Sequence, residues 1–514
     1  MDRKKYAQAA LEDTLIPIRP GSDTTPFWNR CASRFIYAPA FHFQKIDKAV
    51  RYHFMVTDRF DNVFTYDAPS PYAPLTPVWA DIAVGKASVK VDAYDAAGKN
   101  LGESGRFNFY RNACYNASYP PAVTGYLDCA EKAYRFLFKM PAIQHWETGV
   151  PDWGYQLNCY PSKILSSIIT GMLQYAEICP DDRQNAYRIA EKCASYLIDG
   201  AESSDAPLAY FPQTYEGEFL SAKQNKGTIM MIYPAYVGDA MLSLSAVTGN
   251  KKYLDYAERI GERYCSLQQN NGSWHLVCRT SDGKPTDENV FCEPTRIMSF
   301  LENLFKKTGN KCFQTVADRA IPYIREMVRT FDWAGQFEDT RLSTTPYSNL
   351  SKHMACDVVF YLASRYPNNP EIIEPAREVC RFAEDQFIVW EQPGWIGTSD
   401  SYTDDQLQND KWGWYDHWHT PSVLEQYRCY CPIDASVAKL IRYFLFMYDL
   451  TGNKLDLAKA RTLGDSMTQI QEASGRIPTP FRKAPPSPWG DWINCMYASA
   501  FAMKKLAEYD NIEL

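Results

Sequence analysis

The sequence predicts a mainly α-helical fold, an (α/α)6 barrel of six helical hairpins, with a small β-sandwich domain in front of it. Two observations indicate the barrel: a turn-and-helix phrase recurs along most of the chain, and a more apolar helix accompanies each copy. A third observation, strand-like alternation confined to the N-terminal part, indicates the β-domain. The 514 residues therefore divide into an extension over 1–23, a β-sandwich over 24–111 and a barrel over 112–514.

Strands are expected before the barrel. Residues 49–68 and 87–102 alternate between apolar and polar side chains and contain Asp and Gly turn signals. Alternation with a period of two is typical of a half-buried strand. Residues 109–121 are then the connection into the barrel.

The recurring sequence pattern predicts a set of helices with charged faces. An alanine followed by charged residues recurs at spacings of 59 to 82 residues, at Ala130, Ala190, Ala257, Ala317, Ala376 and Ala458. Most copies follow a turn signal, for example the "TGN" of 248–250, 308–310 and 451–453. Glycine and asparagine tolerate the left-handed conformation that ends a helix and reverses the chain. The phrase therefore indicates a structural repeat and not a site.

More apolar helices alternate with the charged ones. The segment 160–178 places Ile164, Ile168 and Met172 on one broad apolar face. Comparable segments begin at 233, 293, 349, 431 and 494. Several carry proline at their second position, where the first turn of a helix tolerates a missing N–H. Six apolar and six charged helices predict a closed double ring with the apolar helices inside; an open solenoid of helical hairpins is the alternative.

Composition narrows the class of protein. A net charge of −7, without a block of Lys or Arg, argues against a nucleic-acid partner. The start of the chain lacks the apolar core of a signal peptide, and the most apolar stretch, 164–176, is too short to span a membrane. Fifteen scattered cysteines are typical of buried reduced thiols. We expect a cytoplasmic protein, or a periplasmic one if a leader has been removed, and the oligomeric state stays open.

Aromatic residues gather in the connections that lead into the apolar helices. Eleven of the 13 tryptophans fall there or at the edges of these connections. Aromatic walls together with carboxylates suit sugars, because the C–H faces of a sugar stack on rings while its hydroxyls need polar partners. We therefore expect an oligosaccharide cavity at the open face of the barrel, with Trp333, Trp390, Tyr427 and Trp489 converging on it. The alternative is that these tryptophans only pack long loops onto the rim.

Two of these connections carry carboxylates as well as aromatic rings. Glycoside hydrolysis needs two carboxyl groups on opposite sides of one bond, one of them protonated. The segments 331–341 and 418–432 supply Glu338, Asp339 and Glu425, and we expect Glu338 or Asp339 to act together with Glu425. The residues expected to bind substrate are Asp152, Trp153, Tyr215, Glu293, Arg296, Trp333, Gln336, Arg341, Trp390, Gln426, Tyr427, Arg428, Tyr430, Arg476 and Trp489.

Other chemistries have less support. The C-x-C of Cys429 and Cys431 lacks a second Cys/His pair with the spacing of a zinc site. The zincin motif, the phosphate-binding loop and the nucleophile elbow are all missing. We therefore expect neither a metal nor a nucleotide cofactor.

Several stretches resemble a known set of proteins. "PFWNRCASRFIYAPAF", "WAGQFED", "FAEDQFIVWE" and "EQYRCYCPIDAS" resemble gut-bacterial polysaccharide-utilisation proteins similar to glycoside hydrolase family 154. The resemblance covers nearly the whole chain. It implies the barrel fold and removal of a terminal β-glucuronic acid. Arg296, Arg341, Arg428 and Arg476 would then suit the uronic-acid carboxylate, which a guanidinium can bind at two points.

Two other classes of function remain open. A polysaccharide lyase would use Tyr427 or Tyr430 with His417 or His419 as base and acid. A sugar-binding protein without catalysis would keep the aromatic walls and need no carboxyl pair. Ultraviolet absorbance of an unsaturated product separates the lyase from the hydrolase.

Overall fold

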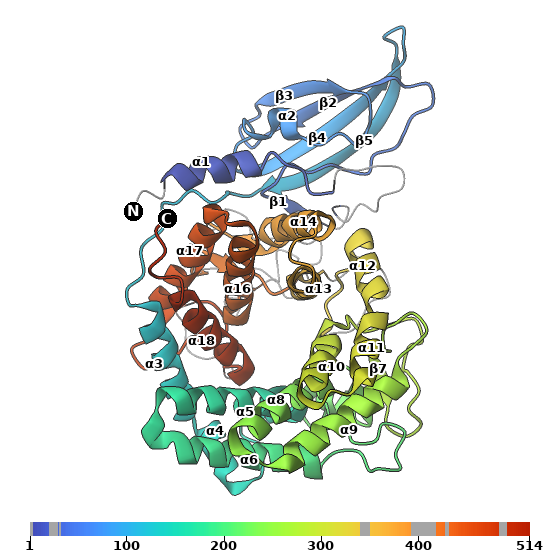
Figure 1. Cartoon of the computed structure of the whole chain (residues 1–514). Coiled ribbons are helices and arrows are strands. Elements are labelled where there is room, and N and C mark those ends of the chain that lie inside the picture. Colours follow the sequence, from blue (N-terminus) through green and yellow to red (C-terminus); the bar gives the residue numbers. More distant parts are fainter. Residues whose placement is uncertain are drawn as a thin grey trace.

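A computed structural model describes residues 4–19, 29, 32–339, 350–391, 418–426, 431–482 and 491–514. These residues form a large helical part and a smaller curled sheet (Figure 1). The prediction of a mainly helical chain is confirmed. None of the helices in these ranges is both long and apolar enough to cross a membrane.

Six helices form the inner layer, and each begins close to the position that the apolar segments predict. They are α5 (Pro161–Ile178), α8 (Tyr233–Thr248), α10 (Thr295–Thr308), α13 (Lys352–Arg365), α16 (Asp434–Thr451) and α18 (Ile493–Ala507). Each contacts the next in chain order, and α18 contacts α5, so these contacts close a ring. A closed series of contacts favours the predicted barrel over an open solenoid.

The charged helices form the outer layer. They are α3 (Tyr126–Phe138), α6 (Arg183–Asp199), α9 (Lys251–Leu267), α11 (Lys311–Arg319), α14 (Pro370–Phe387) and α17 (Lys454–Ile470). Each packs on an inner helix, for example α6 on α5 and α17 on α16. After α11 the outer layer continues as a separate helix, α12 (Ile321–Thr330), because Pro322 cannot donate an N–H within a continuous helix.

The "TGN" turns end inner helices and begin outer ones. Asn250, Asn310 and Asn453 each cap the next helix, accepting a backbone N–H at 3.1, 3.0 and 3.1 Å. The glycine before each asparagine has a φ of 71°, 75° or 70°, in the left-handed region that glycine adopts at little cost. The repeated phrase is therefore a structural turn, as the sequence predicts.

The N-terminal part contains one sheet in its described residues, not the two packed sheets of the expected β-sandwich. Its strands are β1 (Arg34–Phe35), β2 (Arg51–Thr57), β3 (Val63–Ala68), β4 (Gly85–Tyr94) and β5 (Asn100–Arg111), in the order β1-β5-β4-β2-β3. The pairs are antiparallel except β1 with β5.

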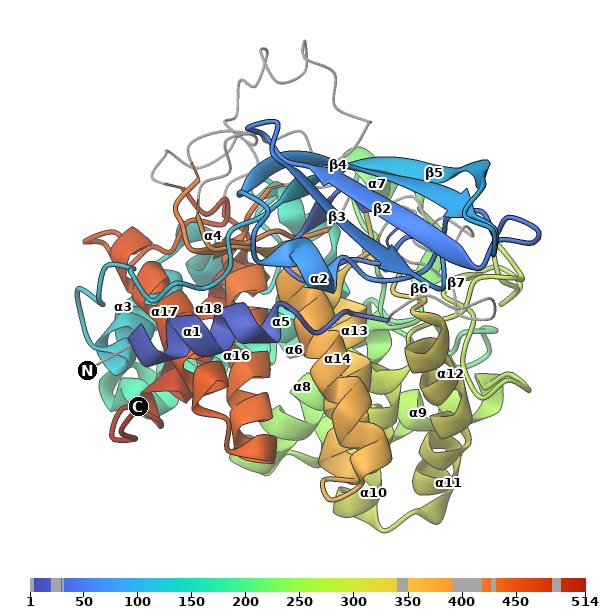
Figure 2. The ribbon, with the colours of Figure 1, turned by 90° about the horizontal axis from the view of Figure 1, so that it is seen from above.

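A short helix and coil take the place of the second sheet. Helix α2 (Thr76–Trp79) lies against the sheet, where the Trp79 ring stacks on Phe109 at 5.9 Å (Figure 2). The chain from 69 to 77 contains four prolines, which lack the N–H that a strand ladder requires. The sequence alternation therefore identifies the strands but not their layering.

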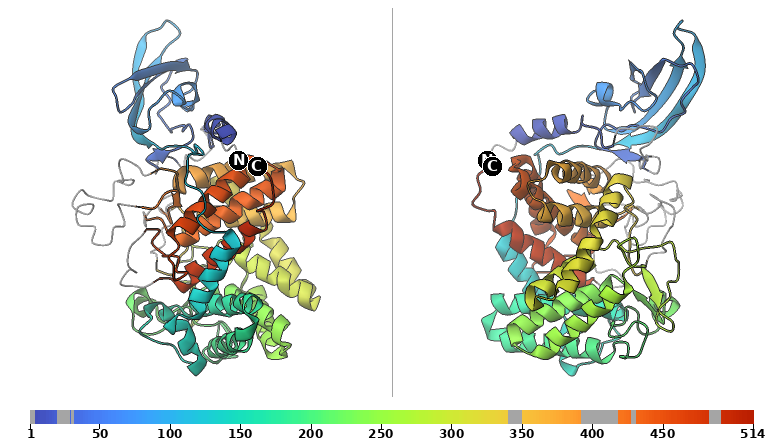
Figure 3. Two further views of the ribbon diagram at one scale, coloured as in Figure 1. Left: turned by 90° about the vertical axis from the view of Figure 1, so that its left-hand side faces the viewer. Right: turned by 45° about the vertical axis from the view of Figure 1, so that its right-hand side comes forward.

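Buried polar groups join the sheet to the ring. Helix α1 (Lys4–Asp13) contacts α17, and β1 contacts α14 (Figure 3). At this junction the Glu384 carboxylate accepts hydrogen bonds from the Tyr37 hydroxyl at 2.9 Å and from Lys459 at 2.5 Å. The Asp385 carboxylate accepts the backbone N–H of Tyr37 at 2.8 Å. The "FAEDQF" segment thus holds the two parts of the chain together.

The remaining described elements are short and lie in the connections. They are α4 (Pro141–Gln144), three 3-10 turns (His145–Thr148, Gln156–Cys159 and Pro180–Asp182), α7 (Leu220–Gln224), β6 (Thr228–Met230), β7 (Val277–Arg279), β8 (Ile388–Val389) and β9 (Ser422–Val423). Strands β6 and β7 pair with each other, as do β8 and β9. Every cysteine in the described ranges is a free thiol, and most are buried.

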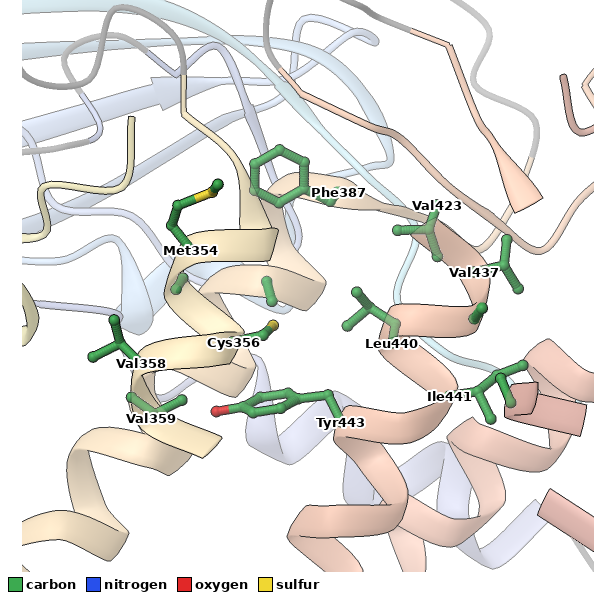
Figure 4. Close-up of a cluster of buried hydrophobic side chains, with 14 of the residues drawn as sticks. Met354, Cys356, Val358, Val359, Phe387, Val423, Val437, Leu440, Ile441 and Tyr443 are labelled. Atoms are coloured by element: carbon green, nitrogen blue, oxygen red, sulfur yellow. The ribbon is translucent and has the colours of Figure 1, made fainter. Parts of the chain in front are cut away.

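Apolar packing fixes helices α13 and α16 next to each other. Their facing side chains include Val359, Leu440 and Tyr443, within one buried cluster (Figure 4). The Tyr443 hydroxyl donates to the carbonyl of Ala376 on α14 at 3.0 Å, which ties the inner layer to the outer one. This packing sets the positions of the polar side chains that the same two helices present to the inside of the ring.

Candidate active site

A cavity of about 530 Å³ lies inside the ring. All six inner helices contribute to its wall: Lys163 and Gln174 from α5, Tyr233 and Tyr236 from α8, Arg296 from α10, His353 and Asp357 from α13, Lys439 and Arg442 from α16, and Asn494 and Phe501 from α18. Lys163 and Gln174 lie about 16 Å apart along their helix, so the cavity is deep. Its size and its mixture of rings, charges and amides are typical of a small-molecule site.

The segment 331–339 positions Glu338. Trp333 is fully buried and anchors the segment in the core. Gln336 fixes its middle, because its amide donates to the Phe291 carbonyl at 2.9 Å and accepts the Glu293 N–H at 2.8 Å. The Tyr215 hydroxyl donates to the Glu338 carbonyl at 3.0 Å. These contacts hold the carboxylate of Glu338 in a defined place.

Glu338 is buried and strongly hydrogen-bonded. Its carboxylate forms an ion pair with Lys163, in the first turn of α5, and accepts a hydrogen bond from the hydroxyl of Tyr233. Although burial lowers it, the pKa of Lys163 is raised overall, chiefly by Glu338 and Asp339. Lys163 and Tyr233 therefore both donate hydrogen bonds to the Glu338 carboxylate.

A small hollow adjoins Glu338. Asp339, Tyr160 and Trp492 line it together with Lys163, and its volume is about 10 Å³. This volume is about what one water molecule needs. The side chain of Asp339 is exposed, unlike that of Glu338.

Glu425 lies on the wall of the main cavity. Its segment is held by the pairing of β9 with β8, and its N–H donates to the Cys431 carbonyl at 3.1 Å. Burial raises the pKa of Glu425 to about 7; Lys352 opposes this shift, and Asp339 and Glu338 add to it. A large fraction of Glu425 is therefore protonated near neutral pH, and Glu338 lies close enough to influence its pKa.

Two basic side chains lie at the start of α13, and one of them, Lys352, contacts Glu425. The Lys352 ammonium donates to the Glu425 carbonyl at 2.6 Å and to the Ser436 hydroxyl at 2.6 Å. His353 lines the cavity edge-on to Phe337, with ring centroids 5.8 Å apart. Burial and the nearby lysines hold the pKa of His353 well below its ordinary value, so its imidazole is neutral.

Most described tryptophans of the expected wall lie elsewhere. Trp333 and Trp390 are fully buried and do not line the cavity. Trp390 packs edge-on against Tyr115 at 5.2 Å and donates to Glu384 at 3.0 Å, at the junction with the N-terminal part. The large apolar surfaces of these rings are buried where they anchor the connecting loops, so they do not form a cavity wall. Trp492 is the exception, since it lines the cavity with its ring 5.2 Å from the Lys163 ammonium.

Several predicted polar residues serve the fold. Arg476 is buried, does not line the cavity, and is paired with Asp491, at 3.0 Å, and with Glu472. Glu293 accepts the Thr295 N–H at 2.8 Å at the start of α10, and burial raises its pKa to about 8. The expectation that Arg476 binds a substrate carboxylate therefore conflicts with its contacts.

The other predicted residues divide into four groups. Asp152 stabilises a turn through the Gly154 N–H at 2.8 Å, and Trp153 is 49% exposed beside it, so both lie outside the cavity wall. Gln426 is buried, and its backbone forms an isolated β-bridge with Ser351. Arg296 and Gln336 line the cavity. Arg341, Tyr427, Arg428, Tyr430 and Trp489 lie outside the described residues, as does His417.

Sequence reasoning missed the polar side chains that the inner helices point into the cavity. Lys163, Tyr233, His353, Asp357, Lys439 and Arg442 were assigned no function. Lys163 and His353 each follow a helix-start signal in helices that are otherwise apolar on their inner side. A lysine or histidine within the first turn of an inner helix was the available signal.

Comparisons with known proteins give structural likenesses only. No family model matches the chain. No curated protein matches it significantly either.

A family 76 glycoside hydrolase from a bovine Bacteroides thetaiotaomicron strain is 11% identical over 91% of this chain and 95% of its own, with a TM-score of 0.43. A sugar epimerase from a ruminal bacterium is 11% identical over 74% and 99%, with a TM-score of 0.48. An unsaturated glucuronyl hydrolase specific for heparin is 10% identical over 75% and 99%, with a TM-score of 0.44. Likeness at this level carries no conclusion about activity.

Metal ligands are not grouped in the described part of the chain. No set of three or more His, Cys, Asp or Glu side chains within it could hold a metal ion. The functional groups on the cavity wall are instead carboxyls, amines, guanidinium groups, phenols and one imidazole. This set is suited to proton transfer and to binding of a polar, hydroxyl-rich molecule.

Proposed function

We propose that this protein is an exo-acting, β-glucuronidase-like glycoside hydrolase, built on a six-hairpin (α/α)6 toroid, that removes a terminal uronic acid from oligosaccharides. One observation carries the proposal: two buried carboxyl groups from different loops lie in mutual electrostatic range, Glu425 on the wall of a deep cavity and Glu338 at the hollow that adjoins it. Burial raises the pKa of Glu425, whereas Glu338 is ion-paired with Lys163, and glycoside hydrolysis requires two carboxyl groups with different roles.

Glu425 is the general acid. Its pKa of about 7 keeps a large fraction protonated near neutral pH, so it can donate a proton to the oxygen of the leaving sugar. Glu338 is the charged partner, because Lys163 and Tyr233 stabilise its carboxylate. The adjoining hollow has room for about one water molecule. Glu338 would orient and deprotonate that water for attack on the anomeric carbon, and the configuration at that carbon would be inverted.

The cavity suits an acidic sugar. Aromatic rings of Tyr236, Trp492 and Phe501 offer stacking surfaces, and the wall carries Lys and Arg side chains from three of the inner helices, α5, α10 and α16. A guanidinium or ammonium group in a partly dehydrated site stabilises a carboxylate strongly. A uronic acid satisfies both features of the wall.

A lyase mechanism fits the described groups less well. A lyase needs a tyrosine that can lose its proton, but burial and the Glu338 charge hold the pKa of Tyr233 well above its ordinary value. The Tyr233 hydroxyl already donates its proton to Glu338. Tyr233 is therefore suited to stabilising the carboxylate and not to abstracting a proton.

A panel of aryl glycosides and aryl uronides tests the proposal. We expect release of the aryl group from a β-glucuronide, little release from the matched β-glucoside, and no rise in ultraviolet absorbance from an unsaturated uronide. An unsaturated product from an oligosaccharide with a 4-linked uronic acid would establish the lyase class instead, because elimination expels the sugar on C4. Binding of uronides without turnover would leave only the sugar-binding function.

A further inference from the structure

Arg442 is a cavity cation with no ion-pair partner among the described residues. The wall carries four Lys and Arg side chains, and three of them form ion pairs: Lys163 with Glu338, Arg296 with Asp239, and Lys439 with Asp357. Arg442 forms no ion pair with any residue that the structure describes, although its side chain is exposed to the cavity. The part of the cavity around Arg442 and Arg296 therefore has an excess of positive charge.

Two guanidinium groups share this part of the cavity. Arg442 lies over the Phe501 ring at 5.0 Å, and Arg296 lies over the Tyr236 ring at 4.1 Å. Burial lowers the pKa of Arg442, the Asp357 carboxylate opposes that change, and the charge of Arg296 adds to it. Like charges held this near to each other repel, and a bound anion removes that repulsion.

We propose that Arg442, together with Arg296 and Tyr236, forms a carboxylate-binding subsite that selects a uronic acid. The inference deepens the proposed function and rests on it for the position of the scissile bond. The Phe501 ring lies against the guanidinium of Arg442, a planar group whose edge can donate two parallel hydrogen bonds. A carboxylate matches this geometry, whereas a neutral hydroxymethyl group does not.

The position of the subsite fits one sugar unit. Lys352 links the Glu425 carbonyl to Ser436, so Glu425 lies at the level of Ser436 on α16. Arg442 follows Ser436 by six residues, about 9 Å along the helix. Long side chains on a helix point back toward its N-terminus, which brings the guanidinium nearer to Glu425. A sugar whose glycosidic oxygen meets Glu425 can then place its ring carboxylate at Arg442.

Calorimetric titration with D-glucuronate, D-glucose and D-glucose 6-sulfate tests the subsite without any turnover. We expect glucuronate to bind the unmodified protein most tightly. Arg442→Gln should weaken glucuronate binding about 10- to 100-fold, the scale of a hydrogen-bonded charge pair, and leave glucose binding unchanged. Tighter binding of the sulfate would assign the subsite to sulfated sugars, and would overturn the uronate assignment.

Matched variants guard against a folding artefact. Arg188→Gln removes an exposed arginine that pairs with Glu147 outside the cavity, and should bind glucuronate normally. Arg442→Lys keeps the charge but loses the two-point contact, so it should show a smaller loss than Arg442→Gln, and it decides the question if Arg442→Gln does not fold. Unchanged glucuronate affinity in either folded Arg442 variant, or equal losses for glucose and glucuronate, would overturn the proposal.

The subsite and the catalytic pair can fail separately. Glu425→Gln leaves the three subsite residues intact, so it should still bind glucuronate while losing turnover. Normal turnover in that variant refutes the catalytic assignment and leaves the binding result standing. Absence of glucuronate binding to the unmodified protein refutes the subsite, whatever the kinetics.

Discussion

The ammonium of Lys352 lies 2.6 Å from the backbone carbonyl oxygen of Glu425. This contact joins the start of α13 to the loop that carries Glu425, and it places a positive charge beside a buried carboxyl group. Lys352 lowers the pKa of Glu425, against the larger effect of burial. The same lysine therefore positions Glu425 and limits how far its pKa rises.

Removing this charge should shift the pH dependence of activity. With Glu425 as general acid, kcat/KM should fall above about pH 7, where its carboxyl loses the proton. Lys352→Met should raise the pKa of Glu425 and move this fall to higher pH, whereas Lys352→Arg should leave it near its original position. Initial rates on an aryl glucuronide from pH 5 to 9 measure the shift. A fall at the same pH in Lys352→Met would contradict the electrostatic role of Lys352.

Replacing either carboxyl of the pair should remove most of the turnover. Glu338→Gln and Glu425→Gln should each lower kcat at least about 100-fold, the scale of general acid–base catalysis. Glu293→Gln is the matched control, because Glu293 is equally buried but caps α10 and does not line the cavity. Near-normal kcat in both variants, with folding intact by circular dichroism, would contradict the assignment of Glu338 and Glu425 as the catalytic pair.

Stability should decrease as the pH rises from about 4 to about 8. Burial raises the pKa of Asp385 and Glu425 to about 7 and that of Glu293 to about 8. Because these folded-state values exceed the unfolded ones, the folded state holds the protons more tightly. This stabilisation is complete below the unfolded pKa values and is lost as the pH passes the folded ones.

Thermal melting across this range measures the effect, and Tm should be higher at pH 5 than at pH 8. Glu293→Gln has no proton to lose at position 293, so its Tm should depend less steeply on pH. An equal or steeper dependence in this variant would show that Glu293 does not contribute.

Trp390 should affect stability and not substrate binding. Trp390→Phe removes the hydrogen bond to the buried Glu384 carboxylate, which costs about 1–3 kcal/mol in the free energy of unfolding. The KM for an aryl glucuronide should stay unchanged, because the ring lies at the junction with the N-terminal part. Trp492→Phe is the contrasting variant and should raise KM, since this ring lines the cavity. A raised KM in Trp390→Phe but not in Trp492→Phe would indicate that Trp390, and not Trp492, contacts the substrate.

Periodic features of the chain were readable from the sequence because local physics sets them. The apolar faces predicted the inner helices from α5 to α18, and the "TGN" turns predicted their ends, since a glycine in the left-handed region and an asparagine cap act within a few residues. The sequence also predicted Glu338 and Glu425 as candidate catalytic residues, because both are carboxylates in loops that lead into neighbouring inner helices.

Only the tertiary structure decided which side chains share the cavity. Lys163 and Glu338 are 175 residues apart in the chain, and no local pattern links them. Trp333, Trp390 and Trp492 are alike in the sequence, as rings in connecting segments, but two are buried anchors and one lines the cavity. Whether an aromatic side chain is buried and whether a charge is paired depend on partners from other repeats. These properties are therefore set only when the helices close into a ring.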